Sequence, residues 1–161
     1  MTAASQPEAS TPSAVTCPNG ATIRAGLPEI KKNGGQAVII SSSYAHVNGI
    51  FNSSYAVSKA AVEALGRALQ IELAPYGASA TIAYFGYVET DLVSKVFDNA
   101  AADRFRDEMV PGFLTKPIKV GKAAGTLVEC IENRSLRVIE SSIWKLPLYM
   151  RGLFGPLSDR R

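Results

Sequence analysis

The sequence predicts an α/β fold in which about three parallel strands are flanked by helices. Apolar residues make up 47% and charged residues 19% of the 161 positions, which is within the globular range. Short β-branched apolar runs alternate along the chain with segments of helical periodicity, an order typical of a parallel sheet. A chain of this length buries one core of ordinary size, so we expect a single folded domain.

The first predicted helix covers residues 20–32. Its apolar residues Ile23, Leu27 and Ile30 recur at helical intervals, and Asn33-Gly34-Gly35 supplies a stop signal. Pro28 removes a backbone donor inside this segment and should kink the helix or end it early. The mainly apolar run of residues 36–40 follows directly and predicts a strand that is buried on both faces.

A long helix is predicted from Ser53 or Ser54 to about Pro75, because apolar side chains keep helical spacing throughout this segment. Residues 79–84 form the next apolar run and predict a second strand. The order strand, helix, strand fits a right-handed parallel crossover. The polar segment from residue 41 to residue 52 then lies at the carboxyl end of a strand, where open α/β sheets bind ligands.

Residues 90–109 and 122–132 are predicted to be helices, and residues 136–139 a third strand. Residues 142–161 are apolar and basic, but their prolines and glycine interrupt a regular helix. We expect an arm that packs on the domain, with contact to a membrane surface as the alternative. The Ala-, Ser-, Thr- and Pro-rich residues 1–18 predict a disordered leader, which leaves residues 19–141 as the folded domain.

Charge and cysteine usage exclude several classes of protein. The net charge is +3, and residues 112–161 hold 9 basic and 4 acidic side chains, but the basic residues are scattered singly, which argues against a nucleic-acid partner. Cys17 and Cys130 lie far apart and His46 is the single histidine, so we expect no metal site. Without the apolar core of a signal peptide or a membrane-length apolar run, we expect a cytoplasmic protein.

Tyr55 and Lys59 are the first candidate catalytic residues. Four positions apart on a helix, they share one face. A tyrosine ordinarily titrates near pH 10, so a neighbouring ammonium that stabilises the phenolate would make it a better proton shuttle at neutral pH. Ser42 ends the preceding strand and is expected to polarise a substrate carbonyl. The alternative interpretation is a turn serine, a helix-start tyrosine and a solvated lysine, since these residue types also recur by chance.

Three stretches resemble the core of the short-chain dehydrogenase/reductase family: VIISSS at residues 38–43, YAVSKAAVEALGRAL at residues 55–69 and ELA at residues 72–74. The resemblance implies a partial Rossmann-like (doubly wound) parallel sheet and an oxidoreductase that uses NAD or NADP. It implies that Ser42 polarises the carbonyl and that Tyr55 donates and accepts the proton. Lys59 is then expected to bind the nicotinamide ribose and to lower the pKa of the tyrosine.

The stretch AYFGYVETD at residues 83–91 resembles the segment that contacts the nicotinamide in this family, with Phe85 in place of a proline. The resemblance implies that Gly86, Val88 and Thr90 approach the cofactor, and a glycine permits close backbone contact there. Ser41 and Ser43 are interpreted as turn residues. The loop after Ser42 supplies three candidate substrate contacts, although such side chains are more often solvated: Tyr44, His46 and Asn48.

Two family features are missing. No G-x-G-x-x-G or TGxxxGIG string occurs in the 161 residues, so the phosphate-binding turn is absent from them. The catalytic asparagine of the family aligns with Val15, and the nearest amide, Asn19, is out of register. The resemblance covers about residues 20–140 and implies the C-terminal half of the family fold, with only the nicotinamide half of the cofactor site and weak cofactor affinity.

The first functional hypothesis is therefore a truncated oxidoreductase that acts on a small-molecule alcohol or carbonyl. The alternative is a catalytically inactive fragment that pairs through residues 54–74, as a homodimer or with a full-length relative. The open edge of the strand at residues 36–40 also favours association. A hydrolase that uses Ser42 and Lys59 is a third hypothesis, but the sequence holds no G-x-S-x-G nucleophile motif.

Overall fold

The computed structural model describes residues 18–46, 53–91, 93, 116–140 and 145–150. Residues 1–17 of the predicted leader, most of the predicted helix at residues 90–109, and Asn48 lie outside these residues, whereas Pro18, assigned to the leader, begins a helix. The described elements, in chain order, are α1 (Pro18–Lys32), β1 (Gln36–Ser42), η1 (Ser43–Ala45), α2 (Ser53–Leu73), η2 (Ala74–Tyr76), β2 (Ser79–Phe85), α6 (Val120–Glu132), β3 (Arg137–Ile139) and α7 (Lys145–Tyr149).

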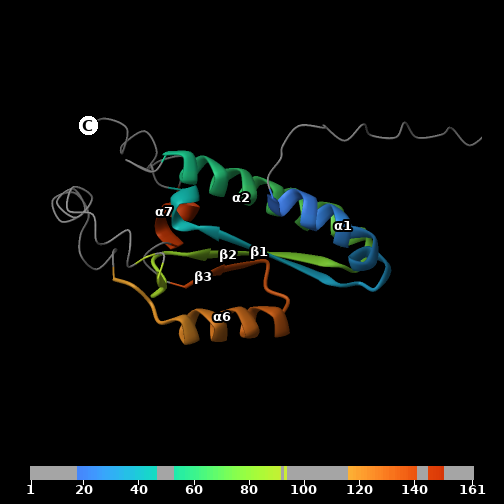
Figure 1. Cartoon of the computed structure of the whole chain (residues 1–161). Coiled ribbons are helices and arrows are strands. Elements are labelled where there is room, and N and C mark those ends of the chain that lie inside the picture. Colours follow the sequence, from blue (N-terminus) through green and yellow to red (C-terminus); the bar gives the residue numbers. More distant parts are fainter. Residues whose placement is uncertain (1–17, 47–52, 92, 94–115, 141–144, 151–161) are drawn as a thin grey trace, which may run out of the picture.

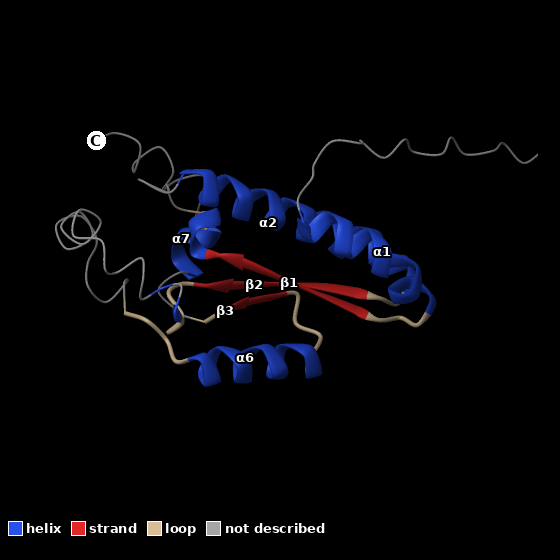
Figure 2. Cartoon of the chain, viewed as in Figure 1, coloured by secondary structure: helices blue, strands red, loops and turns tan. Residues whose placement is uncertain are grey.

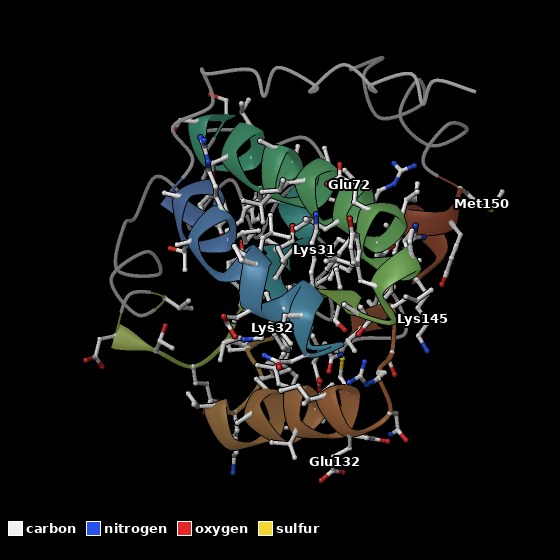
Figure 3. The ribbon with its side chains drawn as sticks, turned by 90° about the vertical axis from the view of Figure 1, so that its right-hand side faces the viewer. Lys31, Lys32, Glu72, Glu132, Lys145 and Met150 are labelled. Carbon is white, nitrogen blue, oxygen red and sulfur yellow. The ribbon has the colours of Figure 1, made fainter. Side chains whose placement is uncertain are left out.

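The described strands form one parallel sheet in the order β1-β2-β3, which confirms the predicted α/β fold. Helices α1 and α2 cover one face of the sheet and α6 covers the other (Figures 1 and 2). The view in Figure 3 shows the same layers from the side, with Lys31 and Lys32 on α1 and Glu132 on α6. Because β1, α2 and β2 make the predicted crossover, the carboxyl ends of β1 and β2 lie at the same edge of the sheet.

The larger core lies between α2 and the sheet. Val62, Leu69 and Leu73 of α2 pack against Ala37 and Ile39 of β1 and against the start of β2, while α1 adds partly buried side chains. Gly66 lets the helix approach closely, since a Cβ built there would lie 2.7 Å from Cγ1 of Ile82. Leu148 of α7 packs with Ile82 and Tyr84.

Helix α6 packs chiefly on β2 and β3, through Ala123 against Ala83 and Phe85. β1 lies at the edge of the described sheet, beyond this cover. Ile40 is consequently 49% exposed, so the expectation that this strand is buried on both faces is wrong at Ile40. The strand also continues two residues beyond the predicted end, to Ser42.

The ends of the helices follow from short-range signals. Helix α1 continues through Pro28 to Lys32, so the proline does not end it early. It stops where Gly34 adopts a positive φ of 57° and the amide of Gly35 donates to the carbonyl oxygen of Ile30 at 2.8 Å. Helix α2 spans the predicted segment and gives way to η2 at Ala74. Among the described residues, no helix has the length and apolar character needed to cross a bilayer.

The end of the sheet where the strands begin is closed by Arg134, in the turn between α6 and β3. Its guanidinium donates to the carbonyl oxygen of Gly34 at 2.8 Å and to that of Gly77 at 3.4 Å. These two glycines lie in the turns that lead into β1 and β2, and both have a positive φ. One side chain therefore holds the three turns together, away from the edge where the candidate catalytic residues lie.

Candidate active site

The candidate site lies at the carboxyl edge of the sheet, where β1 ends and α2 begins (Figure 1). Ser42 is the last residue of β1 and is 4% exposed. Its Oγ accepts a hydrogen bond of 3.3 Å from the amide of Tyr44 and so caps η1. Since this bond uses the hydroxyl as an acceptor, its hydrogen can still be donated to a ligand.

Ser41 ties β1 to α2. Its hydroxyl donates to the backbone carbonyl oxygen of Lys59 at 3.1 Å, and its side chain is buried. Ser41 is thus the penultimate strand residue, with a contact across layers, and the expectation of a turn residue is wrong for it. The bond fixes the helical turn that carries Lys59 against the strand that carries Ser42.

Tyr55 and Lys59 lie on α2 as the four-residue spacing predicts. The Nζ of Lys59 lies 5.5 Å from the centroid of the Tyr55 ring and donates to the carbonyl oxygen of Ile40 at 3.2 Å. Tyr55 is 39% exposed, so its phenol is accessible to a ligand. Ser42 and Tyr55 both contact Tyr44, whose ring centroid lies 5.8 Å from that of Tyr55. Tyr44 therefore contacts Ser42 through its amide and Tyr55 through its ring, at the junction of β1 and α2.

The loop after β2 borders the same edge of the sheet. Gly86 is exposed at its start, and Val88 forms a parallel bridge with Ile118. The amide of Glu89 donates to the carbonyl oxygen of Ile118, and the amide of Ile118 donates to that of Tyr87. Thr90 is exposed, and its Oγ1 accepts from the amide of Val93 at 3.4 Å. The segment predicted to approach a cofactor is thus held in place by backbone hydrogen bonds to Ile118.

Of the three candidate substrate contacts, the structure describes Tyr44 and His46. Tyr44 is half-buried, and its hydroxyl is hydrogen-bonded to that of Tyr87 at 2.9 Å. His46 lies in the interior, with its side chain 2% exposed, which corrects the expectation that it walls the substrate site. Asn48 and the predicted substitute Asn19 have no described side chain.

His46 belongs to a buried polar cluster between η1, α2 and β2. Its Nδ1 lies 3.6 Å from a carboxylate oxygen of Glu63, and its ring centroid lies 4.6 Å from that of Tyr84. Burial raises the pKa of Tyr84 well above its ordinary value, and the charge of Glu63 raises it further. The cluster joins the segment that follows Ser42 to the helix that carries Lys59.

Sequence reasoning missed Glu63, Tyr84 and Tyr87. Glu63 had a usable signal, because it follows Tyr55 and Lys59 at intervals of four on the sheet-facing side of α2, where a charge is unexpected. Tyr84 had no signal beyond that of an ordinary strand residue. Tyr87 carried no signal of its own, since its role depends on which residue the register of the sheet brings beside it.

The described residues fit the nicotinamide-ribose part of a dinucleotide. Lys59 supplies an ammonium, Tyr55 an accessible hydroxyl and Gly86 an exposed backbone with no side chain, all at the carboxyl edge of the sheet. Such groups suit the hydroxyls of a ribose and the amide of a nicotinamide. Among the residues that the structure describes, no three potential metal ligands cluster together.

Comparison with known proteins finds the same family in a family model and in curated relatives. The model of the short chain dehydrogenase family matches residues 20–101. The dehydrogenase OXI1 of Cochliobolus heterostrophus is 36% identical over 100 residues, which cover 59% of this chain and 43% of that protein. The dehydrogenase/reductase SDR family member 7B of Xenopus laevis is 37% identical over 73 residues, covering 45% of this chain and 23% of that one.

Solved structures share the fold. A short chain dehydrogenase of Burkholderia cenocepacia in complex with NADP superimposes with a TM-score of 0.66 and 20% identity, over 88% of this chain and 55% of that one. A short-chain dehydrogenase of Sphingobium yanoikuyae in complex with NADPH gives a TM-score of 0.66 at 19% identity, over 91% and 54% of the two chains. The present chain therefore spans about half the length of these structures and less than half of its curated relatives.

Proposed function

This chain belongs to the short-chain dehydrogenase family, and on that premise we propose that it transfers a hydride between NADP or NAD and an alcohol or carbonyl substrate, with Tyr55 as general acid and base. The observation that supports the proposal is the pair Tyr55 and Lys59 at the carboxyl edge of a parallel sheet, where Tyr44 contacts both Ser42 and Tyr55. Open α/β sheets bind ligands at this edge. Similar structures were solved with NADP or NADPH.

Each residue has a distinct role in the proposed reaction. The bound nicotinamide supplies or accepts the hydride. Ser42 donates its hydroxyl hydrogen to the substrate oxygen, since its Oγ already accepts from the amide of Tyr44. Tyr55 transfers the proton to or from that oxygen. The Nζ of Lys59 lies 5.5 Å from the Tyr55 ring centroid, and the ammonium can hold a ribose hydroxyl.

We further propose that the chain corresponds to the C-terminal half of such an enzyme and binds the dinucleotide weakly. Phosphate contacts usually come from a glycine-rich turn at a helix N-terminus, and the 161 residues hold no such motif. Lys59, Gly86, Val88 and Thr90 would then hold the nicotinamide end alone. We assign the chain to the cytoplasm, since Cys130 is a buried free thiol, in keeping with a reducing compartment.

The test is a titration of the purified chain with NADPH, followed by cofactor oxidation in the presence of a panel of small ketones. Tyr55→Phe removes only the hydroxyl and should lower the rate by about a hundredfold or more, which is the usual range for loss of a general acid. Lys59→Met should lower the rate and should also weaken NADPH binding. Tyr76→Phe and Lys32→Met change exposed residues of the same types and should leave both quantities unchanged.

A rate that survives Tyr55→Phe would refute the assignment of the proton transfer. Absence of NADPH binding at millimolar concentration would refute cofactor use by this chain. In that case the second candidate function applies, in which the chain acts through association. A specific observation favours it, namely that α2 exposes large apolar side chains, with Val57 69% and Ile71 78% exposed.

In the second candidate function, α2 is the contact surface for another copy of the chain or for a full-length relative. Val57→Glu and Ile71→Glu should then convert a dimer to a monomer in light scattering coupled to gel filtration. Val128→Glu is the matched control, since Val128 is 54% exposed on α6, on the other side of the sheet. A dimer that withstands both α2 substitutions would exclude this surface.

A further inference from the structure

Strand β3 forms the second edge of the described sheet, because β2 is its single neighbour there. The carbonyl oxygen of Leu136 and the amide of Glu140 both bond β2, at 3.1 and 3.4 Å. In a parallel pair, alternate residues of a strand bond the same neighbour. The backbone groups of Val138 therefore face β2, and those of Arg137 and Ile139 face the open side.

These outward backbone groups have no partner within the described part of the chain. No hydrogen bond there uses the amide or the carbonyl oxygen of Arg137 or Ile139 on the open side. Unpaired groups in a row along a strand are a template for a further extended chain. The edge of β3 can therefore accept backbone hydrogen bonds from a ligand and donate to it.

A cavity of about 360 Å³ lies along this edge, between α6 and α7. Residues 137–139 line it in succession, together with Thr126 and Cys130 of α6 and Tyr149 of α7. Ligand sites commonly have volumes in this range. Three strand residues span about 10 Å, so the cavity follows the length of a short extended peptide.

The side chains around the cavity favour an acidic ligand. Arg137 and Lys145, the latter labelled on α7 in Figure 3, are exposed, and neither forms an ion pair with another described residue. Glu129 is the acidic member of the lining, so two cations and one carboxylate leave a net charge of +1. Glu140, at the end of β3, is paired with Lys122 at 2.8 Å and adds no net charge.

We propose that the edge of β3 binds an extended acidic segment of a partner protein, which adds to the sheet as a further strand and places its carboxylates beside Arg137 and Lys145. Strand addition draws its affinity from main-chain hydrogen bonds and its specificity from alternate side chains. Leu136 and Tyr149 are large, apolar and exposed near this edge, and they can contact apolar side chains that alternate with the acidic ones.

Charge also distinguishes the partner from two other occupants. Residues 151–161 hold three arginines and one aspartate, so they carry the same sign as the cavity. A second copy of the chain would bring its own Arg137 and Lys145 to the edge, and like charges that meet across an interface oppose binding. The inference goes beyond the proposed function, since neither a cofactor nor Tyr55 takes part in it.

The experiment is a fluorescence anisotropy titration of the whole chain against a labelled peptide of sequence EVEVE, with KVKVK as the reference peptide. EVEVE should bind and KVKVK should not. N-methylation of alternate amides tests strand addition directly, because only one set of amides can donate to β3. Methylation of that set should abolish binding, and methylation of the other set should leave it intact.

Substitutions in the cavity test the charges in opposite directions. Arg137→Met and Lys145→Met should each weaken EVEVE binding about threefold, whereas Glu129→Gln should strengthen it by a similar factor. All three effects should shrink as salt is added. Arg24→Met, at an exposed arginine of α1, is the matched control and should change nothing.

Three outcomes would overturn the proposal: no EVEVE binding at millimolar concentration, equally tight binding of KVKVK, or binding that survives methylation of either set of amides. A dimer that Arg137→Glu converts to a monomer in light scattering would overturn it too, because a second copy would then occupy the edge. Circular dichroism checks the fold of each variant. The peptide comparisons leave the chain unchanged, so they decide even where a variant does not fold.

The readout separates this inference from the proposed function. Peptide binding needs neither cofactor nor hydride transfer, so a chain that binds EVEVE but no NADPH supports the docking edge and refutes the proposed reaction. A chain that oxidises NADPH but binds neither peptide refutes the docking edge alone.

Discussion

At the scale of single residues, buried polar side chains contribute most clearly to the geometry of the candidate site. Ionisable groups rarely lie in a protein interior without partners, because removing them from water costs several kcal/mol. Glu63 is 4% exposed and Tyr84 2%, and both contact His46 in the segment after Ser42. We conclude that the cluster fixes the position of this segment on α2.

The raised pKa of Tyr84 predicts a specific loss of stability in alkaline solution. An unfolded tyrosine ionises near pH 10, whereas Tyr84 in the fold holds its proton to higher pH. The unfolded state therefore loses its proton first, and the free energy of unfolding falls as the pH rises above about 10. Urea unfolding between pH 8 and pH 11 should show a smaller alkaline loss for Tyr84→Phe than for the unsubstituted chain.

The exposed Tyr76 provides the control for this measurement, because Tyr76→Phe should follow the alkaline slope of the unsubstituted chain. If Tyr84→Phe shows that same slope, burial and the charge of Glu63 do not raise the pKa of Tyr84 in the folded state.

At the scale of elements, the fit of α2 on the sheet depends on Gly66. A methyl group there would lie 2.7 Å from Cγ1 of Ile82 and 3.3 Å from Cδ1 of Ile39. Gly66→Ala should therefore destabilise the fold by about 1–2 kcal/mol, since overpacking outweighs the better helix propensity of alanine. Thermal unfolding measures the change.

Gly125 is the matched control for Gly66, because it also lies inside a helix, α6, but a Cβ there would meet nothing within 4 Å. Gly125→Ala should stabilise the fold by up to about 1 kcal/mol. Equal effects of the two substitutions would show that helix propensity, and not the closeness of α2 to β1 and β2, sets the stability at Gly66.

The elements were predictable where short-range signals decide them. Helix α2 was predicted within two residues at either end, because its apolar periodicity is long and Pro75 and Gly77 follow it. The exposure of Ile40 was not predictable, since it depends on where α6 lies across the sheet. The end of α1 at Lys32 was predicted, and the early end considered at Pro28 does not occur, because packing against the core can hold a helix across one absent hydrogen bond.

For the molecule as a whole, the uncovered face of β1 is the feature that most favours unwanted association. Ile40 is 49% exposed on a strand at the edge of the described sheet. Exposed apolar edge strands promote association. Ile40→Lys should lower the fraction of large species in sedimentation velocity, whereas Val120→Lys, at a residue 52% exposed on α6, should have no such effect. Equal effects from both would point to net charge as the cause.

Ser42, Tyr55 and Lys59 could be singled out in the sequence because spacing and family resemblance both apply to them. The contacts that hold these three residues in place could not be predicted from the sequence. The bond from Ser41 to Lys59, the pair Tyr44 and Tyr87, and the contact of His46 with Glu63 all join segments that meet only after the sheet forms. Such contacts depend on register and layer order, which local sequence does not encode.

The pairing of Ser42 with Phe85 determines which side chains meet at the candidate site. Sliding β1 by a single position along β2 would turn every side chain of the strand to the opposite face. Ser41 would then face away from α2 and lose its bond to the carbonyl oxygen of Lys59, and the phenols of Tyr44 and Tyr87 would no longer meet. A chain whose strands pair in another register would therefore lack the proposed site, and any ketone turnover would come only from molecules with the native strand alignment.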